Sequence, residues 1–140
     1  MDSLDRFVTA QARDYAVALA ELQRGRKTSH WIWYVFPQIA GLGRSDMAQR
    51  YAIADLAEAR AYLAHPVLGP RLREATAALL AHAGKRDAVT ILGDIDAMKV
   101  RSSMTLFEVA DTEAEGVFAA CLDAFYAGSR DPETLRRLTC

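Results

Sequence analysis

The sequence predicts an all-α protein, a single compact multihelical domain of about six or seven helices over residues 1–140. Three observations support this fold class. Apolar residues recur at spacings of three, four and seven, as on one face of a helix. No segment alternates apolar and polar residues with period two, and no Asn-Gly or Asp-Gly hairpin turn occurs. Capping residues and glycine or proline stops bracket most of the apolar segments.

The composition and charge of the chain limit which classes of function are possible. A chain of 140 residues with 51% hydrophobic and 25% charged residues is long enough to bury one continuous core. The formal net charge of -1 gives no overall basic field, which argues against nucleic-acid binding. No apolar run is long enough to cross a bilayer, and the N-terminus does not resemble a signal peptide. We therefore expect a cytoplasmic protein without a membrane partner, and the sequence does not indicate its oligomeric state.

Cysteine and histidine usage indicates neither a metal site nor a cofactor. The two cysteines, Cys121 and Cys140, form no disulfide framework and have no zinc-ligand spacing. Cys121 falls on an apolar stripe, so we expect a buried core thiol. His30, His65 and His82 lie far apart, with no partner three or four residues away. No metal ligand is predicted from these residues.

The first helix is predicted between Ser3, as its N-cap, and Gly25, as its stop. Its apolar residues fall on one stripe: Leu4, Phe7, Val8, Tyr15, Leu19 and Leu22. A stripe of this length predicts a long amphipathic helix whose apolar side faces the core.

A second clear helix is predicted in residues 55–66. Asp55 and Glu58 have the spacing of a capping box, and Pro66 ends the helix because the α conformation is disfavoured before proline. The residues expected to point inward are Leu56, Tyr62 and Leu63.

Two helices are predicted in residues 69–93. The first begins with Pro70 at the first helical position and closes at Gly84. Its expected buried residues are Leu72, Leu79 and Leu80. Residues 87–93 are short enough to be a helix or a strand. We favour a helix, because the pattern does not alternate and Asp87 is a good N-cap.

The segment from 95 to 110 is predicted to be a helix capped by Asp94. Most of its positions are apolar, so its few polar residues need partners. Glu108 lies in the middle of this segment, away from any cap. We expect it to pair with an arginine.

Two helices are predicted in the C-terminal part. Thr112 and Glu115 have capping-box spacing before an apolar stripe that ends at Gly128. The stripe consists of Val117, Cys121, Leu122 and Phe125. Asp131 and the proline after it are expected to open a last short helix that ends at Leu138.

The aromatic segment 29–43, SHWIWYVFPQIAGLG, has four of the chain's aromatic residues at six consecutive positions. As a strand it would find no partner for its backbone hydrogen bonds. A short helix is the better interpretation, capped by Thr28 or Ser29 and ended at Phe36, because Pro37 follows. Such a helix is apolar all round and must lie centrally.

Two interpretations of these aromatics remain open. In one, they provide buried area for a core helix. In the other, the rings of Trp31, Trp33 and Tyr34 stack against or wall a planar ligand, with His30 and Gln38 hydrogen-bonding it. Helical spacing places Trp31 and Tyr34 on one face and His30 beside Trp33 on another.

The turn that follows also allows two interpretations. The backbone amides from Gly41 to Ser45 are placed where they could face an anion. A helix cap at Ser45 or Asp46 would explain the same residues.

The second polar constellation lies within DAMKVRSSM. Lys99, Ser102 and Ser103 share one helical face, and Arg101 points roughly away from Lys99. A phosphate or carboxylate would suit these cations and hydroxyls. The alternative is an Asp96–Lys99 salt bridge, a solvated Arg101, and serines bonded to the helix backbone.

Two functional hypotheses follow. In the first, a pocket between the aromatic and cationic helices binds a planar, phosphate-bearing metabolite such as a nucleotide or ADP-ribose, with or without hydrolysis of a glycosidic bond. Its candidate ligand-binding residues are His30, Trp31, Trp33, Tyr34, Gln38, Lys99, Arg101, Ser102 and Ser103. In the second, the protein is a non-catalytic structural or interaction domain. Neither hypothesis assigns a catalytic residue.

The sequence resembles a small, all-helical bacterial family of unknown function whose members are often labelled calpastatin. Four segments show this resemblance: DRFVTAQ (5–11), GRKTSHWIWYVFPQIAGLGRS (25–45), HPVLGPRLREAT (65–76) and ILGDIDAMKVRSSMTLFE (91–108). The resemblance implies a multihelical single domain and no particular activity. Calpain inhibitors called calpastatin are long disordered repeats, so that label implies nothing for this compact chain.

A weaker resemblance is to the YbiA-type proteins linked to NAD and ADP-ribose. Both sequences combine a His- and aromatic-rich helix in the N-terminal third with a later basic helix. The acidic and Trp-Gly positions of that family have no clear counterpart here. The resemblance therefore implies a nucleotide-like ligand and identifies no glycosidase residue.

Overall fold

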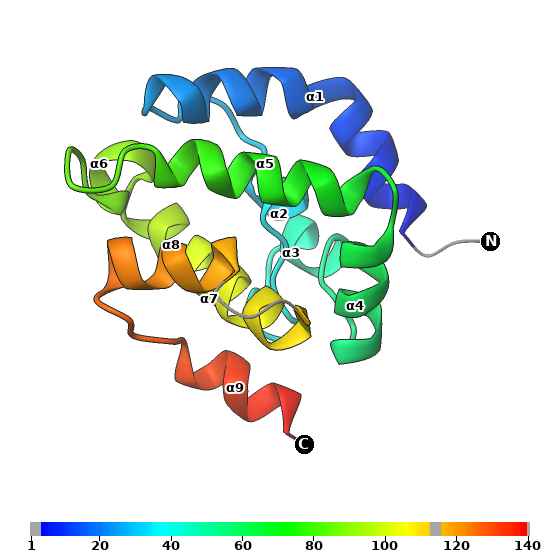
Figure 1. The fold of residues 1–140 in the computed structure, drawn as a ribbon. Helices are drawn as coiled ribbons and strands as arrows, with labels where there is room; N and C mark the ends of the chain where they lie inside the picture. Colours follow the sequence, from blue (N-terminus) through cyan, green and yellow to red (C-terminus); the bar gives the residue numbers. More distant parts are fainter. Residues whose placement is uncertain (1–3, 113–115, 140) are drawn as a thin grey trace.

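The computed structural model describes residues 4–112 and 116–139. These residues form a compact all-helical domain (Figure 1). Its helices are α1 Asp5–Arg24, α2 Ile32–Val35, α3 Asp46–Arg50, α4 Leu56–Ala64, α5 Leu68–Leu80, α6 Ala88–Leu92, α7 Asp94–Ala110, α8 Val117–Tyr126 and α9 Pro132–Leu138. Within the described residues there are nine helices, so the predicted six or seven was too few. Short helices were predicted where α2 and α6 lie, whereas α3, with five residues, is too short to show a periodic pattern.

The helices pack in layers around α7. Figure 1 shows α1 and α5 side by side across the top of the molecule, with α7 and α8 beneath them and α9 at the bottom. Helix α7 contacts α4, α6, α8 and α9, and α5 contacts α1, α4 and α8. The short α2 packs against α1. Among the described residues, no helix combines the length and the hydropathy of a membrane span.

The predicted first helix is confirmed. Its apolar stripe faces inward, with Phe7 and Leu22 at most 1% exposed. Gly25 ends α1 in the left-handed conformation, with φ of 80°, as its C-terminal stop requires. The predicted N-cap, Ser3, lies outside the described residues.

Three predicted N-caps are confirmed. Asp55, Asp87 and Asp131 each accept a hydrogen bond from the backbone N–H three residues further on, at 2.9, 2.8 and 3.1 Å. An N-cap side chain satisfies one of the free amides of the first turn, which is why these positions were predictable from the sequence.

Two other predicted caps are wrong or untested. Asp94 is the first residue of α7, and the N-cap position is Gly93, whose φ of 87° lets the chain turn into the helix one residue earlier. Helix α8 begins at Val117 after Gly116, so Thr112 is not its N-cap. The other half of that predicted capping box, Glu115, lies outside the described residues.

Helix α5 begins earlier than predicted. It starts at Leu68, two residues before Pro70, so the proline is still within the first turn, where no backbone donor is required. Leu72 and Leu79 are buried as expected, whereas Leu80 is only half-buried.

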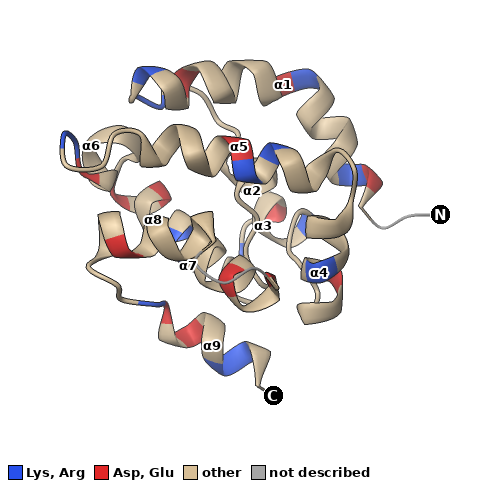
Figure 2. Ribbon diagram, in the orientation of Figure 1, with Lys and Arg blue, Asp and Glu red and all other residues tan. Residues whose placement is uncertain are grey.

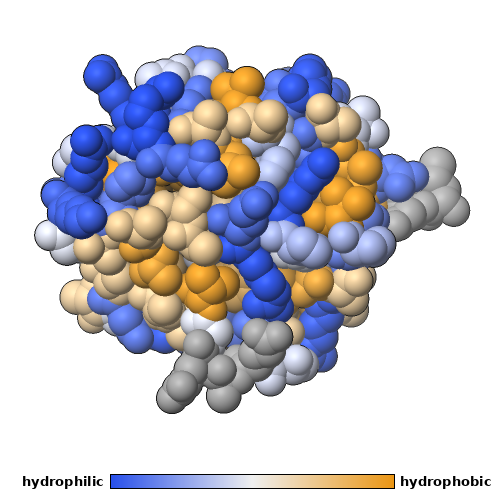
Figure 3. All heavy atoms as spheres, turned by 45° about the horizontal axis from the view of Figure 1, so that its top comes forward, coloured by the Kyte–Doolittle hydropathy of each residue, from blue (hydrophilic) through white to orange (hydrophobic). Residues whose placement is uncertain are grey.

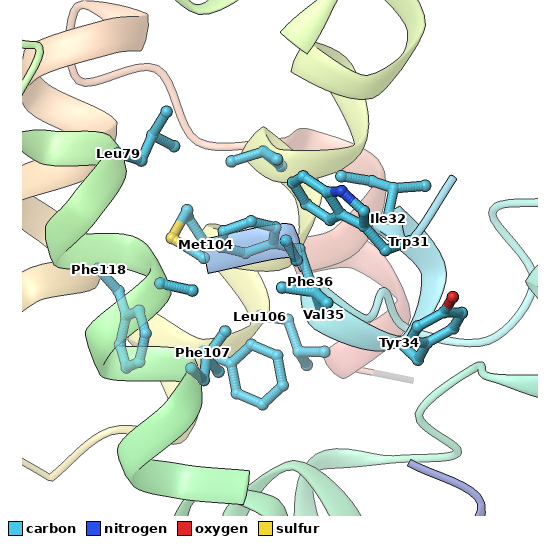
Figure 4. Close-up of a cluster of buried hydrophobic side chains, with 14 of the residues drawn as sticks. Trp31, Ile32, Tyr34, Val35, Phe36, Leu79, Met104, Leu106, Phe107 and Phe118 are labelled. Carbon is cyan, nitrogen blue, oxygen red and sulfur yellow. The ribbon is translucent and has the colours of Figure 1, made fainter. Parts of the chain in front are cut away.

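The aromatic segment is a core element. Helix α2 ends at Val35 with Phe36 as its C-cap, in agreement with the predicted end of the helix, but Trp31 rather than Thr28 or Ser29 is in the N-cap position. Figure 4 shows Trp31 and Phe36 among buried side chains of α5, α7 and α8. Trp31, Tyr34 and Phe36 are each at most 1% exposed. The central position predicted for this segment is therefore confirmed.

The turn after α2 is fixed to the core by one β-bridge. Ile39 and Ile53 pair in parallel, with Ala40 N–H donating to the Ile53 carbonyl and Ile53 N–H donating to the Gln38 carbonyl, both at 2.8 Å. Ser45 then caps α3 by accepting the N–H of Ala48 at 3.1 Å. The helix-cap interpretation of this turn is confirmed at Ser45.

Cys121 is a core residue, as predicted. Its side chain is fully buried, and burial raises the pKa of its thiol to about 12. A thiol with such a pKa stays protonated at neutral pH and is a poor nucleophile.

Candidate functional site

The structure places a pocket of about 330 Å³ where three parts of the chain meet. These are the turn after α2, the first half of α7, and the start of α9. Four of the nine predicted ligand-binding residues line it: Gln38, Lys99, Arg101 and Ser102. Residues 38 and 99 are far apart in the sequence, so the fold brings the two predicted polar segments to one site.

The other five candidates do not line this pocket. Trp31 and Tyr34 lie in the core, and the Tyr34 hydroxyl donates to Asp14. The remaining three differ in burial: Ser103 is fully buried, Trp33 is half-buried and His30 is exposed. The Ser103 hydroxyl has no hydrogen-bond partner among the described residues.

The aromatic segment and α7 meet through cations that cover the indole rings. The Lys99 Nζ lies 5.2 Å from the ring centroid of Trp33, and the Lys27 Nζ lies 5.0 Å from that of Trp31. Such contacts are attractive because the face of an aromatic ring is negative. The ring-rich and cationic helices are therefore adjacent, but the two indoles do not form an open slot for a planar guest.

Asp96 links the two lysines. Its carboxylate contacts the Lys27 Nζ at 2.8 Å and the Lys99 Nζ at 3.9 Å. The Lys27 side chain is only 8% exposed and also donates to the Ser29 carbonyl at 2.5 Å. The Asp96–Lys27 contact thus joins α7 to the segment before α2 through a largely buried ion pair.

We expect Asp96→Asn to lower the free energy of unfolding by about 2 kcal/mol, because it leaves the buried Lys27 ammonium without a counter-charge. Asparagine still offers an acceptor oxygen, so the loss stays below that of removing the side chain. Urea unfolding followed by circular dichroism measures this loss. The control is Asp94→Asn, an exposed carboxylate in the same first turn, where about 0.5 kcal/mol is expected from the helix dipole. Equal losses in the two variants would contradict the buried-pair assignment.

Lys99 is the pocket's available cation. Its ion pair with Asp96 is long, at 3.9 Å, and its side chain is 25% exposed. Leu42 and Gly43 also line the pocket, and their backbone amides donate no hydrogen bond to the described residues; neither does the Gln38 side chain. The pocket thus combines an ammonium with lining residues that have unused donors in the described part of the chain.

Arg101 has a positioning role. Its guanidinium donates to the Ser129 carbonyl at 2.9 Å and to the Arg130 carbonyl at 2.8 Å. It also donates to the Ser129 hydroxyl at 2.6 Å. The interpretation of Arg101 as a solvated side chain is wrong. Arg101 holds the connection between α8 and α9 against α7, which sets the third wall of the pocket.

A second arginine holds the same connection. Arg130 donates to both carboxylate oxygens of Glu108, at 2.9 and 2.5 Å, and to Asp123 at 3.1 Å. The expected arginine partner of Glu108 is therefore confirmed. Paired donors of this kind fix geometry as well as adding energy.

Two residues that line the pocket, Asp131 and Met98, were not among the predicted site residues. Asp131 was interpreted only as a cap, which it is, yet it also lines the pocket. Met98 lines the pocket and is 71% exposed. The sequence offered no signal for this, because Met98 fits the apolar pattern of its helix and only the packing of α9 brings Asp131 and Met98 to one pocket.

Glu21 was also missed. This carboxylate is 3% exposed and accepts the N–H groups of Thr28 and Ser29 at 2.7 and 2.9 Å, and the indole N–H of Trp31 at 3.0 Å. The signal was its register, because residues 7, 11, 14, 18 and 21 follow the buried face of α1. A carboxylate on that face needs buried donors, and the chain before α2 provides them.

The pKa of Glu21 reflects these contacts. Burial opposes its ionisation, but the hydrogen bonds from Ser29, Thr28 and Trp31 outweigh burial and lower the pKa to about 2 from the ordinary 4.5. Glu21 is therefore a structural anion that holds the segment leading to α2, and it does not line the pocket.

Charges of both signs are spread over the helices, and α9 has acidic residues near its start and basic residues near its end (Figure 2). The fold defines a small, all-helical protein with a pocket of about 330 Å³ between a turn and two helices. The chain belongs to the DUF1810 family of proteins of unknown function, whose profile matches residues 1–138.

A solved structure is closely similar to this chain. It is the crystal structure of the conserved hypothetical protein Rv1873 from Mycobacterium tuberculosis, which is 45% identical. The match covers 98% of this chain and 96% of the mycobacterial one, with a TM-score of 0.94. A comparison with curated proteins finds no match. The descriptions of the family and of the mycobacterial protein assign no ligand.

Proposed function

We propose that the pocket binds a small planar metabolite that carries a phosphate group. The observation that carries this proposal is that Gln38, Lys99, Arg101 and Ser102, taken from two distant segments, line one pocket of about 330 Å³. Ligand pockets for small molecules are typically about 300 to 1,000 Å³. The pocket is at the lower end of that range, which favours one mononucleotide over a ligand as large as ADP-ribose.

The anionic group would bind at Lys99. The ammonium is partly exposed, and its long ion pair with Asp96 is easily exchanged for a closer phosphate oxygen. The amides of Leu42 and Gly43 add donors without a charge that would need neutralising. The Arg101 guanidinium already donates to two backbone carbonyls, so it would attract the phosphate mainly through its positive charge.

The planar group would pack on the apolar wall of the pocket. Ile95 and Met98 line it, and their side chains are 69% and 71% exposed, which is unusual for large hydrophobic residues. A thioether packs well against an aromatic ring. This wall takes the place of the stack between indoles, because Trp31 is buried and Trp33 is covered by Lys99.

The proposal is tested by titrating the protein with AMP, adenosine and inorganic phosphate. AMP at 100 times its dissociation constant is expected to stabilise the folded state by about 2.7 kcal/mol, which raises the melting temperature by roughly 8 °C in a chain of this size. Adenosine and phosphate alone are each expected to give a smaller shift at the same concentration. The absence of any shift with millimolar AMP would overturn the proposal.

We expect Lys99→Met to weaken AMP binding about tenfold or more, because a hydrogen bond to a charged group is worth about 1.5 to 3 kcal/mol. Methionine keeps a long side chain over Trp33, so the fold is retained. Adenosine affinity is expected to stay unchanged. The matched control is Lys85→Met, an exposed lysine that does not line this pocket. Equal AMP affinities for the wild type and Lys99→Met, measured by calorimetry, would rule out Lys99 as the anion site.

A protein-interaction role is the second candidate, because apolar side chains are exposed near a separate hollow. A pocket of about 500 Å³ lies between α6, α7 and α8, and it includes Val89, which is 50% exposed, and Met98. On the face shown in Figure 3, apolar areas are interrupted by hydrophilic side chains. The interaction role predicts no stabilisation by AMP, so the same titration separates the two functions.

A further inference from the structure

Only one of the two carboxylate oxygens of Asp131 has hydrogen-bond partners among the described residues. Its Oδ2 accepts the backbone N–H and the hydroxyl of Thr134, at 3.1 and 2.5 Å, and lies 3.2 Å from the Ser102 hydroxyl. Its Oδ1 accepts no hydrogen bond from the described residues. Asp131 is half-buried and lines the pocket that contains Lys99. One oxygen of this pocket-lining carboxylate is therefore without a hydrogen-bond partner among the described residues.

Asp131 is held firmly in this position. Its backbone N–H donates to the Thr105 hydroxyl at 3.0 Å, which attaches the start of α9 to the middle of α7. Arg101 binds the two carbonyls that precede Asp131. A polar group fixed before binding loses little freedom when a ligand arrives, so its hydrogen bond contributes more fully to affinity.

The other carboxylate of the pocket is saturated. Glu133 pairs with Arg136 at 2.5 Å and with Arg137 at 2.9 Å. These two arginines neutralise its charge and occupy its oxygens. Asp131 is therefore the carboxylate on this wall that has an acceptor oxygen without a partner among the described residues.

We propose that Asp131 Oδ1 accepts a hydrogen bond from a ligand hydroxyl, so that the pocket selects a phosphorylated sugar or nucleotide by its sugar hydroxyls. This inference rests on the proposed function and specifies its ligand. An ionised carboxylate only accepts hydrogen bonds, and it repels phosphate. The phosphate group is consequently directed to Lys99 and the hydroxyl-bearing sugar to Asp131, which fixes the orientation of the ligand.

The test compares AMP with 2′,3′-dideoxyadenosine 5′-monophosphate, which has the same base and phosphate but neither sugar hydroxyl. The wild type is expected to bind AMP about tenfold tighter or more, because a site built to bond a hydroxyl rejects an analogue that lacks it. Isothermal titration calorimetry measures both affinities.

Asp131→Asn is expected to reduce this preference to less than about threefold. Its amide oxygen still caps α9 in place of Oδ2, while the second oxygen becomes an NH₂ donor. Asp131→Ser also caps the helix and gives a second variant without a carboxylate. The matched control is Asp87→Asn, because Asp87 caps α6 through the same hydrogen bond and lies outside this pocket. This control is expected to keep the full preference.

The outcomes separate the two proposals. If the wild type binds AMP and the dideoxy compound equally while Lys99→Met still weakens both, the hydroxyl assignment is overturned and the phosphate pocket stands. If Asp131→Asn and Asp131→Ser keep the wild-type preference, Asp131 is not the acceptor. If AMP does not bind the wild type at all, both proposals are overturned.

Discussion

Glu21→Ala is expected to lower the free energy of unfolding by about 3 kcal/mol, one of the two largest losses we expect from single substitutions. The variant removes the acceptor of three N–H groups, from Thr28, Ser29 and Trp31. The Trp31 indole lies in the core, where its N–H cannot turn to water. Urea unfolding followed by tryptophan fluorescence measures the loss, with the emission of Trp31 and Trp33 together as the signal.

Glu21→Gln separates the charge from the hydrogen bonds. The amide oxygen can accept the same N–H groups, and the amide NH₂ can donate to the Ser29 hydroxyl, which now lies 2.5 Å from Oε2. We expect a smaller loss, about 1 kcal/mol, at neutral pH. A loss as large as that of the alanine variant would contradict this geometry, because it would mean that charge alone stabilises the segment.

The two proteins should also differ in acid. The folded-state pKa of Glu21 is lowered to about 2, so the unfolded chain takes up the proton first as the pH falls below 4.5. Its contribution is fully present above pH 4.5 and is lost progressively as the pH falls towards 2. Unfolding curves between pH 6 and 2, on the order of one per pH unit, are expected to fall more steeply for the wild type than for Glu21→Gln. Parallel curves would exclude Glu21 as a source of acid sensitivity.

Gly69→Ala is expected to cost about 3 kcal/mol, although glycine to alanine inside a helix normally stabilises by about 1 kcal/mol. A Cβ at Gly69 would lie 2.1 Å from the carbonyl oxygen of Leu63. That atom belongs to the backbone at the end of α4, so it cannot move without shifting the α4–α5 corner. Thermal unfolding in a calorimeter measures the loss.

Gly84→Ala is the matched control for this prediction. Gly84 has a φ of 79°, but a Cβ there would meet no atom of the described chain within 4 Å. We expect only the cost of a left-handed alanine, about 1 kcal/mol. If Gly84→Ala were the more destabilising of the two, close approach of the helices would not be the reason for glycine at Gly69.

The pocket depends on these structural contacts. Glu21 and Lys27 hold the chain that leads into α2, and the bridge at Ile39 then places the next turn. Helix α9 forms the opposite wall through Arg101. Variants at Glu21 are therefore expected to weaken the proposed ligand binding only as far as they unfold the protein, whereas Lys99 and Asp131 variants are expected to act on affinity directly.

Local patterns in the sequence determined the elements that local physics controls. The long apolar stripe of α1, the stop at Gly25 and the caps at Asp55, Asp87 and Asp131 were all predictable, because each depends on residues within a few positions of one another. The central burial of the aromatic segment was predictable for a related reason. A short helix that is apolar on every side has no face for water.

Elements stabilised by distant residues were not predictable in this way. Thr28 and Ser29 have the chemistry of N-caps, yet their amides bind Glu21, which lies seven and eight residues earlier. Gly93, with a φ of 87°, starts α7 one residue before the predicted cap at Asp94. In each case a tertiary contact or a backbone turn outweighed the local preference.

The sequence by itself determined that this protein is helical, where its long helices run, and in which two segments its aromatic and its cationic polar residues gather. Only the tertiary structure decided which of those groups meet. It buried Trp31, Tyr34 and Ser103, engaged Arg101 with a loop, and left Lys99 and Gln38 at a pocket completed by Asp131. The physical reason is that helix periodicity fixes the face of a side chain along its own axis, whereas the rotation and contacts of packed helices decide what that face meets.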